Sequence, residues 1–306
     1  MSFRHLRSLV LSCCFCLAGF EIGLAADSAL VVGVNDCPQF RLPGGTRPRP
    51  LRGAEFDADR MAAILNERFD FAKEHVTVLK GEAATLHGVC TAFKQLAKRL
   101  QPQDRFVFYY AGHGTQIDDV KPFDEQTDHL DEALCLFDAT EKGTGLLVDD
   151  QLGLLLDELP AQRVTVLLDC CHSGTGIKDG DEEFVPRALP IVTARRINQK
   201  SDEPWDDLQS SAKSIDRNLT VFYACQPEQQ AYERRVRIEG RFVRAGQFTH
   251  YLVEELESAA VGISSRQLLD ALTVRLNAEF NNLRNEAVDQ QHPVMQSDKP
   301  QSLLFD

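Results

Sequence analysis

Short apolar runs rich in valine and aromatic residues alternate along this chain with longer segments whose apolar residues recur at helical spacing. This alternation predicts an α/β fold, in which a mostly parallel central sheet is covered by helices on both faces. The expected strands are residues 29–35, 75–79, 105–110, 163–169 and 219–224, and the expected helices are residues 53–69, 84–100, 149–159, 247–257 and 264–285.

Two chemically reactive side chains follow expected strands directly. His113 comes just after the strand at 105–110, in "YYAGHG", and the pair Cys170 and Cys171 follows the strand at 163–169, in "LLDCCHSGTG". In parallel sheets, ligands bind beyond the carboxyl ends of the strands. His113 and the cysteine pair are therefore expected to be neighbours in space.

A histidine beside a cysteine can hold the thiol as a thiolate nucleophile and later protonate a leaving group. The backbone amides of Gly114 and Gly174 are candidates for stabilising an oxyanion, because glycine lets the main chain approach a substrate closely. Taken alone, the same residues also fit an inert buried cysteine and a histidine that only turns a loop.

Several ordered blocks carry a more specific signal. "YYAGHGTQ" and "VTVLLDCCHSGT", together with "DEALCLFDA", "LVDDQL", "ACQPEQQAYE" and "GQFTHYLVEEL", resemble the metacaspases and bacterial caspase-like (orthocaspase) cysteine peptidases. The resemblance implies a caspase-like three-layer sandwich, with His113 as general base and Cys171 as nucleophile. Cys170 stands where that family usually has a small residue. Neighbouring side chains on a strand diverge, so Cys170 and His172 are expected to point away from the site of Cys171.

The resemblance also implies a specificity pocket lined by Asp57 and Asp169. Asp169 lies two residues before Cys171, which returns its side chain to the same face of an extended chain. Two carboxylates favour Arg or Lys before the cut bond and disfavour Asp. For Asp57 the alternative is simple stabilisation of a helix N-terminus, worth about 0.3 to 1 kcal/mol.

Residues 115–150 are expected to form an acidic loop. Hard oxygen ligands from such a loop could bind Ca²⁺, which activates many metacaspases, although no cofactor is needed for the chemistry itself. The resemblance places candidate ligands near Asp128, Asp149, Asp150 and Asp179. Most acidic loops are simply solvated, so this set is a hypothesis.

The first 26 residues have the layout of a signal peptide, with Arg4 and Arg7 before an apolar run and small residues before Asp27. The alternative is an uncleaved anchor. A signal peptide predicts an exported protein, periplasmic or secreted, whose single peptidase domain spans residues 27–306. Export would place six remaining cysteines in an oxidising compartment.

The formal charge of −13 disfavours nucleic acid and anionic membranes as partners. The resemblance implies protein or peptide substrates with Arg or Lys before the cut bond. A polar loop is expected at 178–218, and its basic residues, Arg187 among them, could be cut by the protein itself. The leading hypothesis is an exported cysteine endopeptidase that cuts after Arg or Lys. The alternatives are a catalytically silent caspase-like binding or scaffold domain and a caspase-like hydrolase of other specificity.

Overall fold

The computed structural model describes residues 26–118, 129–172, 183–192, 217–259, 262–283 and 290–305. Gly174, Asp128, Asp179 and the expected signal peptide up to residue 25 lie outside these ranges. Within them, no helix has the length and apolar character needed to cross a membrane.

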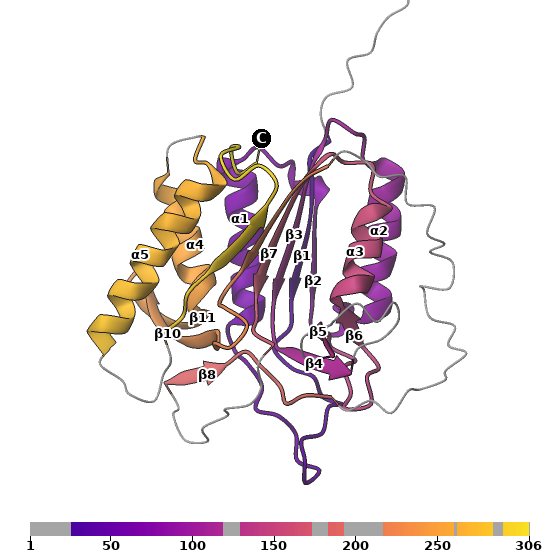
Figure 1. The fold of residues 1–306 in the computed structure, drawn as a ribbon, viewed down its shortest axis with the longest axis vertical. Coiled ribbons are helices and arrows are strands. Elements are labelled where there is room, and N and C mark those ends of the chain that lie inside the picture. Colours follow the sequence, from indigo (N-terminus) through magenta and orange to yellow (C-terminus); the bar gives the residue numbers. More distant parts are fainter. Residues whose placement is uncertain are drawn as a thin grey trace, which may run out of the picture.

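A six-stranded sheet forms the centre of the fold, in the order β12-β9-β7-β3-β1-β2 (Figure 1). All neighbours pair in parallel except β12, which runs antiparallel to β9 at one edge. The expected mostly parallel sheet is confirmed. Its strands are β1 (Ser28–Gly33), β2 (Val76–Lys80), β3 (Arg105–Ala111), β7 (Arg163–Asp169), β9 (Asn218–Tyr223) and β12 (Val294–Ser297).

Helices cover both faces of this sheet, which makes three layers. Figure 1 shows α1, α4 and α5 on one face and α2 and α3 on the other. Each face has its own apolar core, because alternate strand residues point to opposite sides. The helices are α1 (Ala54–Arg68), α2 (Leu86–Arg99), α3 (Asp149–Asp157), α4 (Gln247–Ser258) and α5 (Ser265–Leu283). All five agree with the expected helices to within a few residues.

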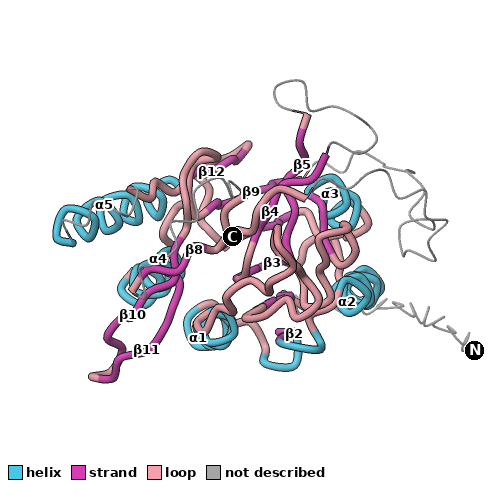
Figure 2. The backbone as a smooth tube through the Cα atoms, turned by 90° about the horizontal axis from the view of Figure 1, so that it is seen from below, coloured by secondary structure: helices cyan, strands magenta, loops and turns pink. Residues whose placement is uncertain are grey.

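Two small antiparallel sheets lie beyond the carboxyl ends of the parallel strands, at the bottom of Figure 1. The first has the order β4-β5-β6 and the second β11-β10-β8. Figure 2 looks onto this end of the molecule and shows β4 close beside the end of β3. These strands are β4 (Gly114–Asp118), β5 (Leu130–Cys135), β6 (Leu146–Val148), β8 (Phe184–Pro186), β10 (Tyr232–Ile238) and β11 (Arg241–Gly246).

The structure corrects the expected acidic loop at 115–150. This stretch contains most of β4, all of β5 and β6, and the start of α3. The first four residues of β5 alternate, with Leu130 and Glu132 partly buried and Asp131 and Ala133 buried, and Leu134 and Cys135 are both buried. The many acidic residues of this stretch favoured a loop in the sequence analysis, so the strand was not predicted.

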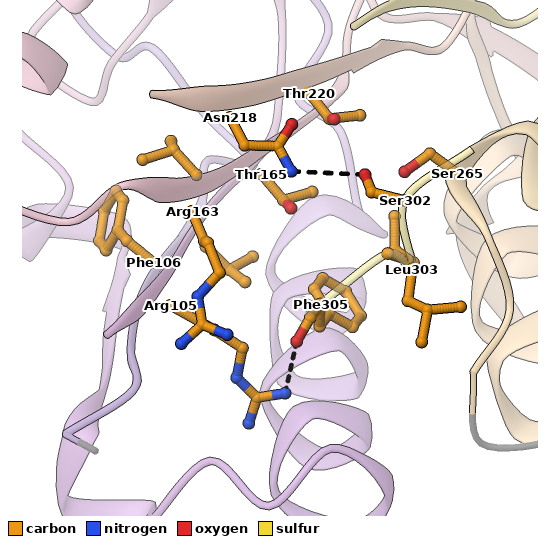
Figure 3. Close-up of a pocket in the computed structure, with 13 residues that line it drawn as sticks. Arg105, Phe106, Arg163, Thr165, Asn218, Thr220, Ser265, Ser302, Leu303 and Phe305 are labelled. Carbon is orange, nitrogen blue, oxygen red and sulfur yellow. Dashed lines mark hydrogen bonds between the residues drawn. The ribbon is translucent and has the colours of Figure 1, made fainter. Parts of the chain in front are cut away.

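The opposite, amino-terminal edge of the sheet is closed by the end of the chain (Figure 3). The Arg105 guanidinium donates to the backbone carbonyl of Phe305 at 2.6 Å, and the amide of Asn218 donates to the Ser302 hydroxyl at 3.4 Å. The hollow between them holds only about 10 Å³. It is a packed structural joint, far from the strand ends that carry His113 and Cys171.

Candidate active site

The ends of β3 and β7 bring His113 and Cys171 to the same part of the sheet edge. Ala111 and Asp169, the last residues of the two strands, are paired in register. The chain leaves β3 through Gly112 and leaves β7 directly into the two cysteines. His113 and Cys171 are both buried, with 4% and 1% of their surface exposed.

The two adjacent cysteines point to opposite faces of the sheet. Cys170 packs in the core on the α2 and α3 side, where its sulfur lies 3.8 Å from Nε2 of His172. Cys171 packs in the core on the α1 and α4 side, and its sulfur lies 3.8 Å from the carbonyl of Ala231. His172 is therefore associated with Cys170. All cysteines among the described residues are free thiols.

Two backbone amides converge on one carbonyl oxygen beside these residues. The amide of Gly114 and the amide of Cys171 both donate to the carbonyl of Arg187, at 3.0 and 3.2 Å. A pair of amide donors of this kind is what an oxyanion hole provides. His113 directly precedes Gly114 in the chain, and Cys171 carries the second amide donor. A Cβ at Gly114 would come within 2.4 Å of the Cys171 carbonyl, which explains the glycine.

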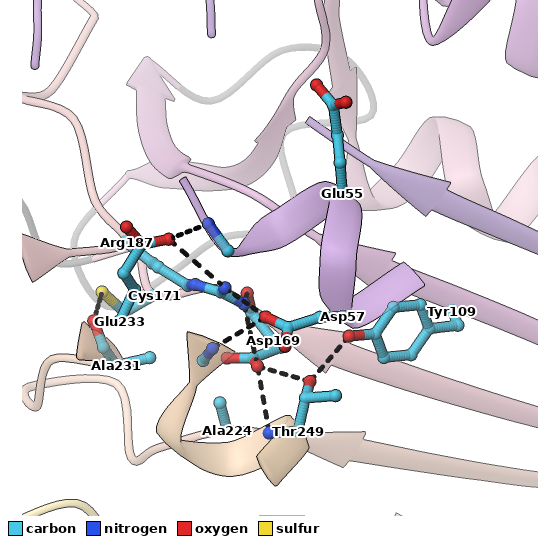
Figure 4. A network of polar contacts seen from close by, with 12 residues as sticks. Glu55, Asp57, Tyr109, Asp169, Cys171, Arg187, Ala224, Ala231, Glu233 and Thr249 are labelled. Carbon is cyan, nitrogen blue, oxygen red and sulfur yellow. Dashed lines mark hydrogen bonds and ion pairs between the residues drawn. The ribbon is translucent and has the colours of Figure 1, made fainter. Parts of the chain in front are cut away.

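Asp57 and Asp169 meet around the side chain of Arg187 (Figure 4). One terminal nitrogen of the guanidinium lies 2.5 Å from Oδ2 of Asp57, and the other lies 2.8 Å from Oδ2 of Asp169. All three side chains are fully buried. Arg187 was expected on an exposed polar loop. This expectation is wrong, because ion pairs with Asp57 and Asp169 stabilise the guanidinium in the interior.

Three neighbouring groups hold the two aspartates in place. Thr249, in the first turn of α4, donates to Oδ2 of Asp169 from its amide at 3.1 Å and from its hydroxyl at 2.5 Å. The Tyr109 hydroxyl bonds to the same threonine at 2.6 Å (Figure 4). The amide of Gly246 donates to Oδ2 of Asp57 at 2.7 Å. These hydrogen bonds orient the two carboxylates independently of their ion pairs with Arg187.

Gly246 also makes room for the guanidinium. A Cβ at this position would lie 2.2 Å from Oδ2 of Asp169 and 2.4 Å from a terminal nitrogen of Arg187. The backbone of Gly246 is ordinary, with φ of −64°, so a side chain is excluded by space and not by conformation.

A third carboxylate, Glu233, lies near the same guanidinium nitrogen of Arg187 that pairs with Asp57. Its Oε2 is 3.8 Å from a terminal guanidinium nitrogen. The same carboxylate accepts from the amides of Arg52 and Gly53, with the shortest bond at 2.6 Å. Gly53 is the N-cap residue of α1 and Arg52 precedes it, and the helix has no side-chain cap from its own N-cap residue. Glu233 therefore fixes the helix that carries Asp57.

Sequence reasoning missed Gly246, Thr249 and Glu233. All three fall inside blocks that carried the family resemblance, "GQFTHYLVEEL" and "ACQPEQQAYE". The blocks indicated that these stretches belong to the family pattern, but they did not indicate which of their side chains face the site. That depends on the register of β10 and on where α4 begins.

Burial shifts the protonation of the site. It raises the pKa of Asp57 to about 7, and the charge of Asp169 acts in the same direction while Arg187 opposes it. Burial also lowers the pKa of His113 to about 4, partly offset by the backbone of Arg49. His113 is therefore neutral at pH 7, the state in which an imidazole can accept a proton.

The expected calcium ligands are only partly described. Asp149 and Asp150 begin α3, and the charges of Glu132 and Asp131 act on Asp149. Among the residues that the structure covers, no group of three His, Cys, Asp or Glu side chains is placed to hold a metal ion. Asp128 and Asp179 fall outside that part of the chain.

This sheet order, with a thiol at the end of β7 and an imidazole just after β3, is the architecture of the caspase-like cysteine hydrolases. The Caspase domain family model (peptidase C14) matches residues 26–305, so the chain belongs to the caspase-domain family, whose members are cysteine peptidases. The resemblance to metacaspases is confirmed.

Curated relatives include two fungal metacaspases. Metacaspase-1A of Aspergillus niger is 31% identical over 157 residues, which cover 49% of this chain and 36% of the relative. Metacaspase-1 of Ajellomyces capsulatus is also 31% identical over 157 residues, covering 49% and 41%. The match thus spans little more than a third of their length.

A solved structure extends the likeness to most of the chain. The crystal structure of protein GSU0716 from Geobacter sulfurreducens has a TM-score of 0.61 and 30% sequence identity. The match covers 89% of this chain and 92% of that one. The fold therefore agrees well beyond the region shared with the fungal metacaspases.

Proposed function

We propose that this protein is a cysteine endopeptidase that hydrolyses peptide bonds after Arg or Lys, with Cys171 as nucleophile and His113 as general base. One observation carries the proposal. A guanidinium lies between Asp57 and Asp169, while the carbonyl of the same residue accepts from the amides of Gly114 and Cys171. The recognised side chain and the reacting carbonyl thus belong to one residue, as they do in a peptidase substrate.

The charge of the pocket supports the choice of basic side chains. A buried carboxylate pair stabilises a cation and would repel an aspartate, so the specificity of animal caspases is disfavoured here. Arg can satisfy both acids through separate nitrogens, and Lys offers a single ammonium. We therefore expect Arg to be preferred over Lys.

In the proposed reaction His113 takes the proton from the Cys171 thiol, and the thiolate attacks the carbonyl carbon. The amides of Gly114 and Cys171 stabilise the oxyanion. His113 then protonates the leaving amine, which leaves a thioester on Cys171. Water, deprotonated by His113, hydrolyses the thioester and restores the thiol. Gly174 stays a candidate for a further amide donor.

The test is a panel of short fluorogenic peptides that differ only in Arg, Lys, Asp or Ala before the reporter. The protein spanning residues 27–306 should cut the Arg and Lys peptides, and Cys171→Ala or His113→Ala should abolish this cleavage. Cys170→Ala is the matched control, because its sulfur lies on the other face. Activity that survives in Cys171→Ala and disappears in Cys170→Ala would refute the assignment.

We also propose export, on the composition of residues 1–26. Expression of the whole chain in a bacterial host, followed by fractionation and N-terminal sequencing, tests it. Processed protein in the periplasm or medium, starting near Asp27, is expected. Unprocessed protein retained in the cytoplasm or the membrane would contradict it.

A further inference from the structure

Arginines gather on one face of the small sheet β8-β10-β11, beside the candidate active site. In the pairing of β10 with β11, Arg235 lies directly opposite Arg244, and Arg237 lies opposite Phe242. Paired residues, and alternate residues along a strand, share a face, so these four side chains lie on one side of the sheet. Figure 2 shows the two strands running side by side away from the central sheet.

A shallow hollow of about 700 Å³ opens beside these side chains, and we call it the arginine hollow. Its described lining residues are Arg52, Arg235, Arg244, Glu183, Phe242 and Val243. The Phe242 ring is 64% exposed, and the guanidinium of Arg235 lies over it at 5.1 Å from the ring centroid. This local excess of positive charge is opposite in sign to the formal charge of the chain, −13.

The arginines of the hollow repel one another. Like charges that lie directly opposite each other on paired strands destabilise a sheet, and Arg235 and Arg244 form such a pair. Burial lowers the pKa of Arg244, and the charges of neighbouring arginines, Arg235 and Arg52 among them, act in the same direction while Glu233 opposes them. A carboxylate bound in the hollow would relieve this repulsion.

The pairing of β8 with β10 connects the hollow to the candidate active site. The two strands are antiparallel, with Phe184 opposite Arg234. Continuing this register by one residue places Glu183 opposite Arg235, and the Arg244 guanidinium donates to the carbonyl of Glu183 at 2.8 Å. A residue at this place on the edge of β10 therefore lies against both arginines.

The same register fixes the number of residues between the hollow and the reacting bond. Glu183 stands four residues before Arg187, whose carbonyl accepts from the amides of Gly114 and Cys171. Peptides commonly bind by adding a strand to a sheet edge, where the main chain supplies affinity and side-chain pockets supply specificity. A peptide that follows the register of β8 on β10 presents to the hollow the residue four positions before its basic residue.

We propose that the arginine hollow is a specificity site that selects substrates with Glu or Asp four positions before the Arg or Lys at which they are cut. The inference rests on the proposed function and adds a second requirement to its substrates. Arg235 and Arg244 donate to the substrate carboxylate, and hydrogen bonds between charged partners are stronger than neutral ones. The hollow is open to solvent, so the selection weakens as salt is added.

Two fluorogenic peptides test the preference, acetyl-Glu-Phe-Val-Pro-Arg and acetyl-Gln-Phe-Val-Pro-Arg, each with the reporter after Arg. In the protein spanning residues 27–306, kcat/KM for the Glu peptide should exceed that for the Gln peptide by about three- to tenfold at low salt. The ratio should approach one in about 1 M salt, where screening acts within about 3 Å. Both peptides compete equally with β8 for the edge of β10, so the ratio reports the hollow. Equal values at low salt would overturn the proposal.

Arg235→Glu reverses the charge that faces the peptide. It should abolish the preference for the Glu peptide and favour a peptide with Lys at that position, while acetyl-Val-Pro-Arg, which is too short to reach the hollow, should be cut as by wild type. The variant should keep the wild-type melting temperature or exceed it, because an opposite-charge pair with Arg244 replaces a like-charge pair.

Arg266→Glu, at the exposed start of α5, is the matched control for net charge. It changes the charge of the chain equally at a residue outside the lining of the hollow, so it should keep the preference for the Glu peptide. An equal loss of the preference in Arg235→Glu and Arg266→Glu would assign it to the net charge of the protein and overturn the proposal.

A binding measurement separates this proposal from the proposed function. Fluorescence anisotropy of the two labelled peptides with Cys171→Ala requires no cleavage. Tighter binding of the Glu peptide, without cleavage by the wild type, would support the hollow and refute the peptidase. Cleavage of both peptides with equal kcat/KM would refute the hollow and leave the peptidase standing. If neither peptide binds Cys171→Ala, the hollow is not a substrate site.

Discussion

Asp169 and Cys171 stand two residues apart at the end of β7 and face the same side of the central sheet. Asp169 binds the guanidinium of Arg187, while the amide of Cys171 binds the carbonyl of that same arginine. The spacing of Asp169 and Cys171 along one extended stretch of chain therefore sets the distance between the charged group of a substrate and the peptide bond that is cut. The alternation of side chains along a strand is enough to create this geometry.

Neutralising either pocket carboxylate should weaken recognition of Arg. In Asp169→Asn or Asp57→Asn, a charge-assisted bond becomes a neutral one, and hydrogen bonds to charged groups contribute about 1.5 to 3 kcal/mol. We expect kcat/KM for Arg peptides to fall by about 10- to 100-fold. The measurement compares Arg and Ala peptides in variants that already carry Arg187→Ala. If the ratio of kcat/KM for the Arg peptide to that for the Ala peptide does not change, the two aspartates do not bind the substrate side chain.

Gly246→Ala should exclude the guanidinium by volume alone. The added methyl would occupy the space between Asp169 and the guanidinium, so KM for Arg peptides should rise sharply while the thiol still reacts with iodoacetamide. Gly153→Ala in α3 is a suitable control, since nothing lies within 4 Å of its Cβ position. If Gly246→Ala binds Arg peptides normally, the guanidinium lies elsewhere.

Binding of Arg substrates should depend on pH through Asp57. Its pKa is about 7 with the guanidinium present, and Arg187 acts to lower it. The emptied pocket loses that lowering influence but keeps the burial and the charge of Asp169, so the pKa lies higher and substrate binding expels a proton. In Arg187→Ala, KM for Arg peptides should fall as pH rises above about 7, by up to about tenfold per unit, until the pH passes the higher pKa of Asp57 in the empty pocket.

The control for this pH dependence is the additional change Asp57→Asn, which has no proton to release. Its KM should vary little over the same range. Because His113 and Cys171 affect mainly kcat, separate profiles of KM and kcat distinguish the pocket from the reacting pair. A KM that is flat with pH in Arg187→Ala itself would contradict the assignment.

Calcium binding stays a proposal that solution measurements can test. Burial and then the charges of Glu132 and Asp131 raise the pKa of Asp149 at the start of α3, and a hard divalent cation bound there would relieve this repulsion. Millimolar Ca²⁺, but not the same concentration of Mg²⁺, should raise the melting temperature, and Asp149→Asn should remove the effect. Equal melting curves with Ca²⁺ and with a chelator would exclude this role.

The sequence was sufficient to predict the central layers. The strands at β3 and β7 are apolar and β-branched enough to recognise, and the parallel arrangement follows from the helices between them. The placement of His113 and Cys171 at neighbouring strand ends follows from the same rule. The two cores also agree with the expected divergence of Cys170 and Cys171.

The small sheets and the occupant of the pocket could not be predicted in this way. β8 has three residues, too few for a periodic pattern, and its partner strand β10 lies far along the chain. Arg187 looks like a surface residue in a polar stretch, because a buried arginine is stable only when distant carboxylates converge on it. The three carboxylates come from three separate elements of the fold, α1, β7 and β10.

The position of β9 in the sheet has a consequence for a chain whose backbone is cut anywhere between β7 and β9. Everything up to β7 lies before the break and everything from β9 onward lies after it, yet β7 and β9 are joined along six paired residues. Pocket walls come from both pieces, with Asp57 and Asp169 on one and Thr249 and Glu233 on the other. Severing the backbone should thus yield a tightly associated heterodimer, separable by denaturant but migrating as one particle in native solution.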